Sequence, residues 1–258
     1  MMPVLEICEI PLIFPKGKRV HPSMGSIFHG ALMERIAPEA AAVFHTQHMR
    51  PYSQAVFWDP VKKRAVWRLG FLEEGAAAAI LPVLEELDHL DLRQQGYAVR
   101  LGGMRCQSFS LEEDFHTAED VPVGVTIRFL TTTSFKRDGS YVLFPEAGLL
   151  YQSILHRWPL LSDMPLEDGI HRILDYYTIV QDYDLHTELF HLEGHSVKGF
   201  SGTVTLRFGG NARLRSFASL LLYCGSAAGF GIKTALGMGS AEVQFIHKGN
   251  HVSRRRRG

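Results

Sequence analysis

The chain has 258 residues, of which 46% are hydrophobic and 21% charged, so it can bury one large core or two ordinary ones and is not a disordered chain. Its 27 basic and 27 acidic side chains cancel, so binding to an anionic polymer must depend on local patches rather than on net charge. No apolar run reaches the length of a membrane span, and Cys8, Cys106 and Cys224 form no CxxC pair, which excludes a membrane-spanning helix and a cysteine zinc site. We expect a cytoplasmic protein in which Cys8 and Cys224 are buried thiols and no disulfide framework exists.

The first half of the chain predicts the order strand, helix, strand, strand, helix, strand. The expected strands cover residues 3–14, 53–58, 65–72 and 97–110, and the expected helices cover 23–36, with Ser23 as N-cap, and 75–87; a short helical turn begins at Pro38. This order is typical of a ferredoxin-like fold. The acidic stretch from residue 112 to 120 then predicts a linker.

A similar order follows the linker. Residues 123–133 predict a strand, 135–141 a hairpin with Asp138-Gly139 at its turn, 147–158 a helix, 166–180 a less regular helical stretch, 198–208 a strand, 217–228 a helix with Ser216 as N-cap, and 240–247 a closing strand. The sequence therefore predicts an α+β protein of two tandem ferredoxin-like domains. Their expected bounds are 1–115 and 121–248, followed by a basic tail over 249–258.

A glycine-rich stretch connects the last helix to the last strand. Gly229, Gly231, Gly237 and Gly239 form two GxG pairs around Lys233. Glycine allows positive φ and close backbone approach, and successive amides with a lysine suit a phosphate. Neither a Walker A loop nor a dinucleotide fingerprint fits this helix-loop-strand order. The alternative is a tight connection with no ligand.

The C-terminal segments KGFSGTVTLRF and SFASLLLYCGSAAGFGIKTALGMGSAEV resemble the CRISPR-associated endoribonucleases that process precursor crRNA, a family of the repeat-associated RNA-binding superfamily. The match covers about fifty residues and extends over most of the chain, including FLTTTSFKRDGSYVLFPEAGLLYQSILHRW. The resemblance implies metal-independent cleavage of CRISPR repeat RNA, which leaves 5′-hydroxyl ends and needs no cofactor.

Candidate catalytic residues come from the segment HGALMERIAPEAAAVFHTQHMRPYSQAVF. Its resemblance to the family places the catalytic histidine at His45 and the assisting basic residue at Arg50. The position where some members carry a catalytic tyrosine falls at Met33, so His29 on the same predicted helix is a second candidate. Histidine suits proton transfer near neutral pH, and a cation suits the charged phosphorane. The alternatives are a half-buried histidine closing a short helix and a histidine at the edge of an amphipathic face.

Candidate RNA contacts are Lys233, Lys136, Arg137 and Arg213 together with the four loop glycines. The hairpin over 135–141 combines basic and aromatic groups, which suits a nucleic-acid groove or a flipped base; the alternative is a soluble hairpin tip. Trp58 and Trp67 lie in predicted strands, where we expect them in the core.

Two other functions stay open at the level of sequence. One is a non-catalytic RNA-binding subunit of the same superfamily. The other is a metalloenzyme that uses His186, His191 and His195, although their spacing matches no common zinc motif and a polar loop explains them as well. The resemblance implies repeat RNA as the partner and assembly with subunits of an interference complex. We also expect a homodimer and no association with a membrane.

Overall fold

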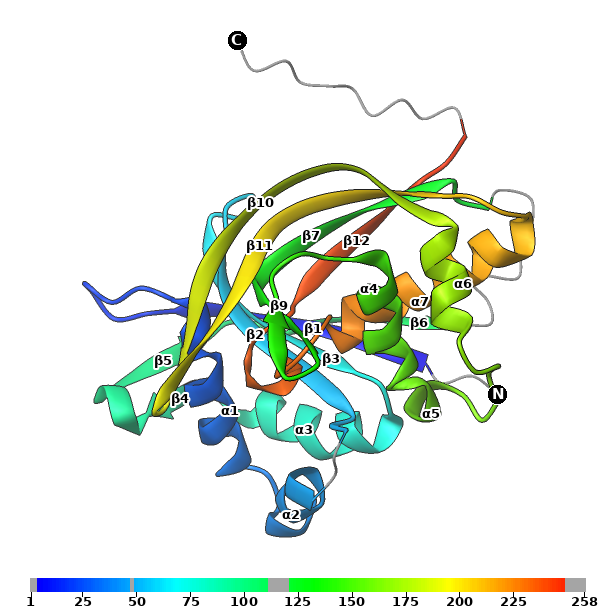
Figure 1. Ribbon diagram of the computed structural model, residues 1–258. Helices are drawn as coiled ribbons and strands as arrows, with labels where there is room; N and C mark the ends of the chain where they lie inside the picture. The colour runs from blue at the N-terminus through cyan, green and yellow to red at the C-terminus, as the bar shows by residue number, and fades with distance from the viewer. Residues whose placement is uncertain (1–3, 47–48, 111–120, 249–258) are drawn as a thin grey trace.

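The computed structural model describes residues 4–46, 49–110 and 121–248, except for the side chains of residues 45 and 46 (Figure 1). Each half of the described chain builds its own antiparallel sheet with helices packed on it. The two halves have the element order of ferredoxin-like domains, as the sequence predicts. The predicted boundary between residues 115 and 121, the linker and the basic tail lie outside the described residues.

The N-terminal unit has a sheet in the order β2-β3-β1-β5-β4, with β6 also paired to β1. Its elements are β1 (Val4–Ile13), α1 (Gly25–Met33), α2 (Pro38–Thr46), β2 (Tyr52–Asp59), β3 (Arg64–Phe71), α3 (Glu74–Glu86), β4 (His89–Leu92), β5 (Tyr97–Leu101) and β6 (Arg105–Ser110). The single strand predicted over 97–110 is wrong: it is two strands, which pair with different parts of β1. Ser23 lies inside a 3-10 turn before α1 rather than at its N-cap, because the turn already starts at Pro22.

The separate strand β6 also corrects the prediction about cysteines. Cys106 lies opposite Cys8 in the β1–β6 ladder, with Cα atoms 4.0 Å apart, and the two are joined by a disulfide. The expectation of a free thiol at Cys8 is therefore wrong. Cys224 is a buried free thiol as expected, and burial raises its pKa to about 12.

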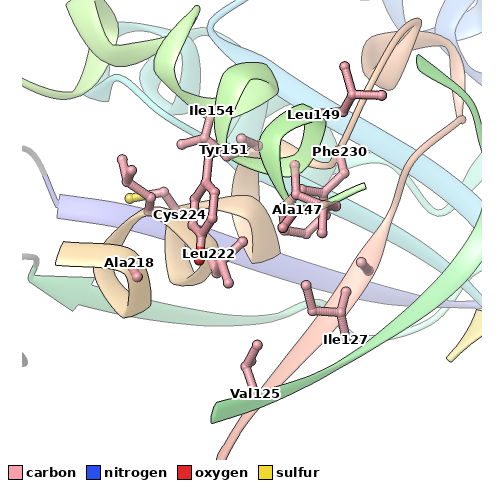
Figure 2. Close-up of a cluster of buried hydrophobic side chains, with 14 of the residues drawn as sticks. Val125, Ile127, Ala147, Leu149, Tyr151, Ile154, Ala218, Leu222, Cys224 and Phe230 are labelled. Atoms are coloured by element: carbon pink, nitrogen blue, oxygen red, sulfur yellow. The ribbon is translucent and has the colours of Figure 1, made fainter. Parts of the chain in front are cut away.

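The C-terminal unit has a four-stranded sheet in the order β10-β11-β7-β12. Its elements are β7 (Gly124–Thr133), the hairpin β8 (Phe135–Arg137) and β9 (Ser140–Val142), α4 (Ala147–Leu155), α5 (Trp158–Leu161), α6 (Ile170–Tyr176), β10 (Thr178–Leu192), β11 (His195–Phe208), α7 (Ala212–Ala228) and β12 (Ala241–Ile246). The core between this sheet and helices α4 and α7 includes Ile127, Tyr151, Leu222 and Phe230 (Figure 2).

Three local predictions in this unit can be compared with the structure. Asp138 and Gly139 form the β8–β9 turn with φ of 50° and 81°, as the Asp-Gly pair predicts. The α7 helix begins earlier than expected, and Asn211 rather than Ser216 caps it by accepting from the Leu214 amide. The helical stretch predicted over 166–180 is only partly right, because β10 begins at residue 178 and forms a long hairpin with β11.

The two units touch through close backbone contacts. A Cβ on Gly70 in β3 would lie 2.0 Å from the Ala227 carbonyl oxygen, so glycine is required where α7 crosses the strand. The Ser53 hydroxyl in β2 donates to the same Ala227 carbonyl at 2.5 Å. The C-terminal end of α7, and the loop that follows it, are therefore held against the N-terminal sheet.

Candidate functional site

A cleft of about 500 Å³ lies between the two units. Arg50 faces it from the N-terminal unit, Lys136 from β8, and His156 and Arg157 from the end of α4, while loop residues 231–236 supply the remaining wall. We call it the interdomain cleft. Four of the predicted site residues, Arg50, Lys136, Gly231 and Lys233, thus meet in one cavity although they come from three separate segments of the sequence.

The four loop glycines are required by the backbone. All have positive φ, between 70° and 110°, and a Cβ on Gly231 or Gly239 would lie 2.2 or 2.0 Å from a carbonyl oxygen. The amide of Gly229 donates to Gly225 O, and that of Gly239 donates to Thr132 O. These two amides are therefore used inside the fold, and the glycines shape the loop rather than all contributing amides to a phosphate cradle.

Lys233 is the cation of this loop. It has a φ of 56°, a left-handed conformation that is uncommon outside glycine and that recurs at functional sites. Its carbonyl accepts from the amides of Leu236 and Met238. The half-buried side chain lines both the interdomain cleft and a neighbouring groove near His191. Lys233 therefore lies where the interdomain cleft meets the neighbouring groove.

Arg157 was not singled out in the sequence, yet it holds the loop. Its guanidinium donates to the carbonyls of Ser153, Gly229 and Gly231 and to the Thr234 hydroxyl, over 3.0–3.3 Å. Within the described residues Arg157 has no ion pair, and burial lowers its pKa to about 10, so it stays charged at neutral pH. A half-buried cation therefore lies beside the glycine loop and adds positive potential to the cleft.

His29 lies behind Arg50 on the N-terminal side of the cleft. It is 7% exposed; its Nε2 lies 3.4 Å from Arg50 Nη1 and its Nδ1 lies 3.1 Å from the Tyr52 hydroxyl. Arginine can only donate, so we assign the proton of neutral His29 to Nδ1, which donates to Tyr52. The Tyr52 hydroxyl then donates to Met33 Sδ at 3.8 Å. Burial raises the pKa of Tyr52 to about 12, although nearby Arg50 opposes that rise, so the hydroxyl stays protonated.

Gln54 fixes the helix that carries His29 relative to the glycine loop. Its amide nitrogen donates to Gly25 O at 2.8 Å and to Ala235 O at 2.9 Å, and its oxygen accepts from Trp67 Nε1 at 2.9 Å. Gly25 begins the helix that carries His29, and Ala235 belongs to the loop that carries Lys233. One buried amide thus joins the two walls of the cleft.

The remaining predicted residues have different surroundings. His45 lies near the end of α2, but its side chain is outside the described part. Arg137 is paired with Glu146 on the hairpin. Arg213 lies in the first turn of α7, about 22 Å along the helix from the glycine loop, so it does not share the cleft.

The alternative hypothesis that His186, His191 and His195 bind a metal ion is wrong. His186 and His191 lie on β10 and His195 begins β11, not in a loop, and they do not converge on a common point. His186 bonds to Ser201 and His191 to Ser196 instead. In the part of the chain that the structure describes, the one group with metal-ligand spacing is Glu6, Cys8 and Cys106, and its two sulfurs form the disulfide. No described helix is both long and apolar enough to cross a membrane.

Two ferredoxin-like units, with a glycine-rich loop in the last helix-to-strand connection, resemble the proteins of the repeat-associated RNA-binding class. The family model described as CRISPR-associated endoribonuclease Cas6 matches residues 127–241. A Cas6 endoribonuclease of Streptococcus thermophilus is 25% identical over 90% of this chain and 97% of its own length, and one of Mycobacterium tuberculosis is 27% identical over 86% and 72%. A solved Cas6 product complex superposes with a TM-score of 0.77 at 23% identity, over 93% of this chain and 99% of its own. The chain therefore resembles Cas6 endoribonucleases in sequence over most of its length, and it shares the fold of the solved Cas6 structure.

Proposed function

We propose that the protein cuts precursor crRNA within the CRISPR repeat, and that the interdomain cleft is where it cuts. The proposal rests on one observation: Arg50, Lys136 and Lys233, from three separate segments of the chain, line one cavity beside His29. Three cations around a cavity suit the binding of a phosphodiester and the adjacent phosphates of an RNA backbone. The family supports an RNA endonuclease, and its named relatives are CRISPR-associated endoribonucleases.

The proposed reaction is an internal transesterification that needs no metal. A base removes the proton of the 2′-hydroxyl, the oxygen attacks the adjacent phosphorus, and the bond to the 5′-oxygen breaks. An acid returns a proton to that leaving oxygen. The products are a 2′,3′-cyclic phosphate, which can open to a 3′-phosphate, and a 5′-hydroxyl.

The roles of the residues follow from their positions. Arg50 stabilises the charge that grows on the phosphorane oxygens, whereas Lys233 binds a phosphate of the RNA in the ground state and the transition state alike. In the free protein the Arg50 guanidinium donates to His29 Nε2; a phosphate that binds Arg50 competes for that donor and releases Nε2 for proton transfer. His45 supplies the second proton-transfer group, as the family resemblance implies. Arg157 keeps the loop in place.

Repeat RNA is the proposed partner of the cleft. Subunits of an interference complex and a second copy of the chain stay predictions that rest on the resemblance alone.

The test is to incubate the protein with repeat RNA in EDTA and to identify the product ends. We expect cleavage with a 2′,3′-cyclic phosphate or 3′-phosphate and a 5′-hydroxyl. The same RNA with one 2′-deoxy nucleotide at the cut site should bind equally and stay intact. Tight binding with no cleavage of the all-ribose RNA would instead assign the chain to a non-catalytic RNA-binding role.

A further inference from the structure

Two basic segments that are far apart in sequence meet at the distal end of the N-terminal sheet. Lys18 and Arg19 follow β1, whereas Lys63 and Arg64 lie at the turn from β2 into β3. All four line an open cavity of about 730 Å³ together with Trp58, and no acidic side chain of the described residues lines it. We call these five residues the Trp58 surface.

Trp58 is the unexpected member of this surface. The prediction that it belongs to the core is wrong: it is 56% exposed, whereas Trp67 on the neighbouring strand is fully buried, as predicted. Trp58 lies near the end of the edge strand β2, opposite Ala65, which in turn lies opposite Leu12 in β1. The small side chain of Ala65 leaves space beside the indole, so an aromatic face is open to a ligand.

The charges of the surface are not neutralised by neighbouring acids. The nearest carboxylate, Asp59, accepts from the amides of Val61 and Lys62 in the turn and pairs with the Lys62 ammonium, which also pairs with Glu9. Those contacts involve neither Lys63 nor Arg64.

Within the described part of the chain, neither Lys63 nor Arg64 has a carboxylate within 4 Å, and the buried Nε of Arg64 has no hydrogen-bond partner. A buried donor without an acceptor is costly, so an oxygen ligand at Arg64 would remove that cost.

The Trp58 surface is distinct from the interdomain cleft. Strand β2 begins at Tyr52, beside His29, and reaches Trp58 six residues later, which places the two about 20 Å apart. A ligand at one site therefore does not occupy the other, although a chain of several nucleotides can span both.

We propose that the Trp58 surface is a second RNA site, which binds single-stranded RNA outside the cleavage cleft by stacking a base on Trp58 and pairing phosphates with the surrounding cations. An exposed indole beside Lys63 and Arg64, which have no carboxylate partner among the described residues, matches the combination used for sequence-tolerant single-strand binding; Lys18 lies over the Tyr97 ring. The net charge of the chain is zero, so this concentration of positive charge is local. The site rests on the proposed function only in that the transcript is its natural ligand.

The experiment measures tryptophan fluorescence during titration with a 12-nucleotide oligouridylate that has no repeat sequence. Trp67 and Trp158 are buried, so quenching reports Trp58. We expect salt-dependent quenching for the wild type, a loss of quenching with Trp58→Leu, and about tenfold weaker binding for both Trp58→Leu and the double variant Lys63→Ala/Arg64→Ala. The control Arg172→Ala/Lys198→Ala removes two exposed charges elsewhere and should bind as the wild type does.

Three outcomes would overturn the proposal: absence of quenching, quenching that the double variant leaves unchanged, or equal quenching by polyglutamate, which would indicate an acidic protein partner. Cleavage of a minimal repeat RNA by Trp58→Leu separates the two claims. It should stay at the wild-type rate, because Trp58 lies outside the cleft. If the wild type cuts no repeat RNA but binds oligouridylate through Trp58, the proposed function fails and the second site stands.

Discussion

The two walls of the interdomain cleft are built in opposite ways. The loop wall, residues 229–239 with Arg157 behind them, is fixed by backbone hydrogen bonds and by glycines that no other residue can replace. The histidine wall consists of Arg50, which lines the cleft, and of His29 and Tyr52 behind it, whose side chains can exchange hydrogen-bond partners. From this difference we infer that one wall shapes and binds while the other reacts; Gln54 joins the two through its hydrogen bonds to Gly25 and Ala235.

The largest expected effect belongs to the proposed proton-transfer group His45. His45→Ala should lower the single-turnover cleavage rate by roughly 10²- to 10⁴-fold, because it removes a proton-transfer group, while RNA affinity stays near the wild-type value. The rate is measured with excess enzyme and the affinity by filter binding. His89→Ala, on an exposed strand of the same unit, is the control and should cut normally. A His45→Ala protein that cuts at the wild-type rate would remove His45 from the mechanism.

Substitutions of the glycines in the loop wall should lower the free energy of unfolding. Gly231→Ala should lower the free energy of unfolding by roughly 2–4 kcal/mol, because its Cβ would collide with Ser134 O at a positive φ. Gly96→Ala is the matched control: its φ is also positive, at 70°, but nothing lies within 4 Å of the added Cβ. Urea unfolding separates them, and equal losses in both variants would mean that the collision is relieved.

Arg157→Met tests the cation behind the loop. The substitution leaves the carbonyls of Gly229 and Gly231 without this donor, so unfolding should become easier by about 1–3 kcal/mol and RNA binding should weaken. Arg172→Met removes an exposed charge from α6 and should change neither quantity. Wild-type affinity in Arg157→Met would show that the loop keeps its shape and potential without the guanidinium.

The smallest expected effect is on alkaline stability. The pKa of Tyr52 is about 12 in the folded protein and about 10 when unfolded, so its contribution is complete below pH 10 and is lost as the pH rises from 10 toward 12. Tyr52→Phe should therefore lose less stability between pH 8 and pH 11 than the wild type, by on the order of 1 kcal/mol. Tyr183→Phe, on an exposed tyrosine, should behave as the wild type does. Equal alkaline losses in both variants would contradict the assigned burial effect.

The sequence was most informative where local chemistry decides structure. Asp138-Gly139 predicted its turn because both residues tolerate positive φ, and the helix-loop-strand order around Lys233 located the loop wall. Strand β10 escaped prediction because it is an edge strand whose mostly exposed positions are polar, so it has no apolar periodicity.

Long-range contacts account for most of what the sequence did not reveal. Arg157 lies inside the helix predicted over 147–158, and no local pattern indicates that a loop about seventy residues later returns to it. The disulfide depends on the β1–β6 register, which one continuous strand over 97–110 would not allow. Exposure of Trp58 likewise depends on its position at a sheet edge, since strand propensity does not distinguish it from buried Trp67.

The most direct test of the division between the walls is a paired measurement on Arg50→Ala and Lys233→Ala. For each protein the dissociation constant for repeat RNA and the single-turnover rate at saturating enzyme are measured in EDTA. We expect Arg50→Ala to lose rate by at least tenfold with little change in affinity, and Lys233→Ala to lose affinity, with a salt dependence lower by about one counterion, at a nearly unchanged rate. Variants that lose rate and affinity in equal proportion would contradict the division of binding and chemistry between the two walls.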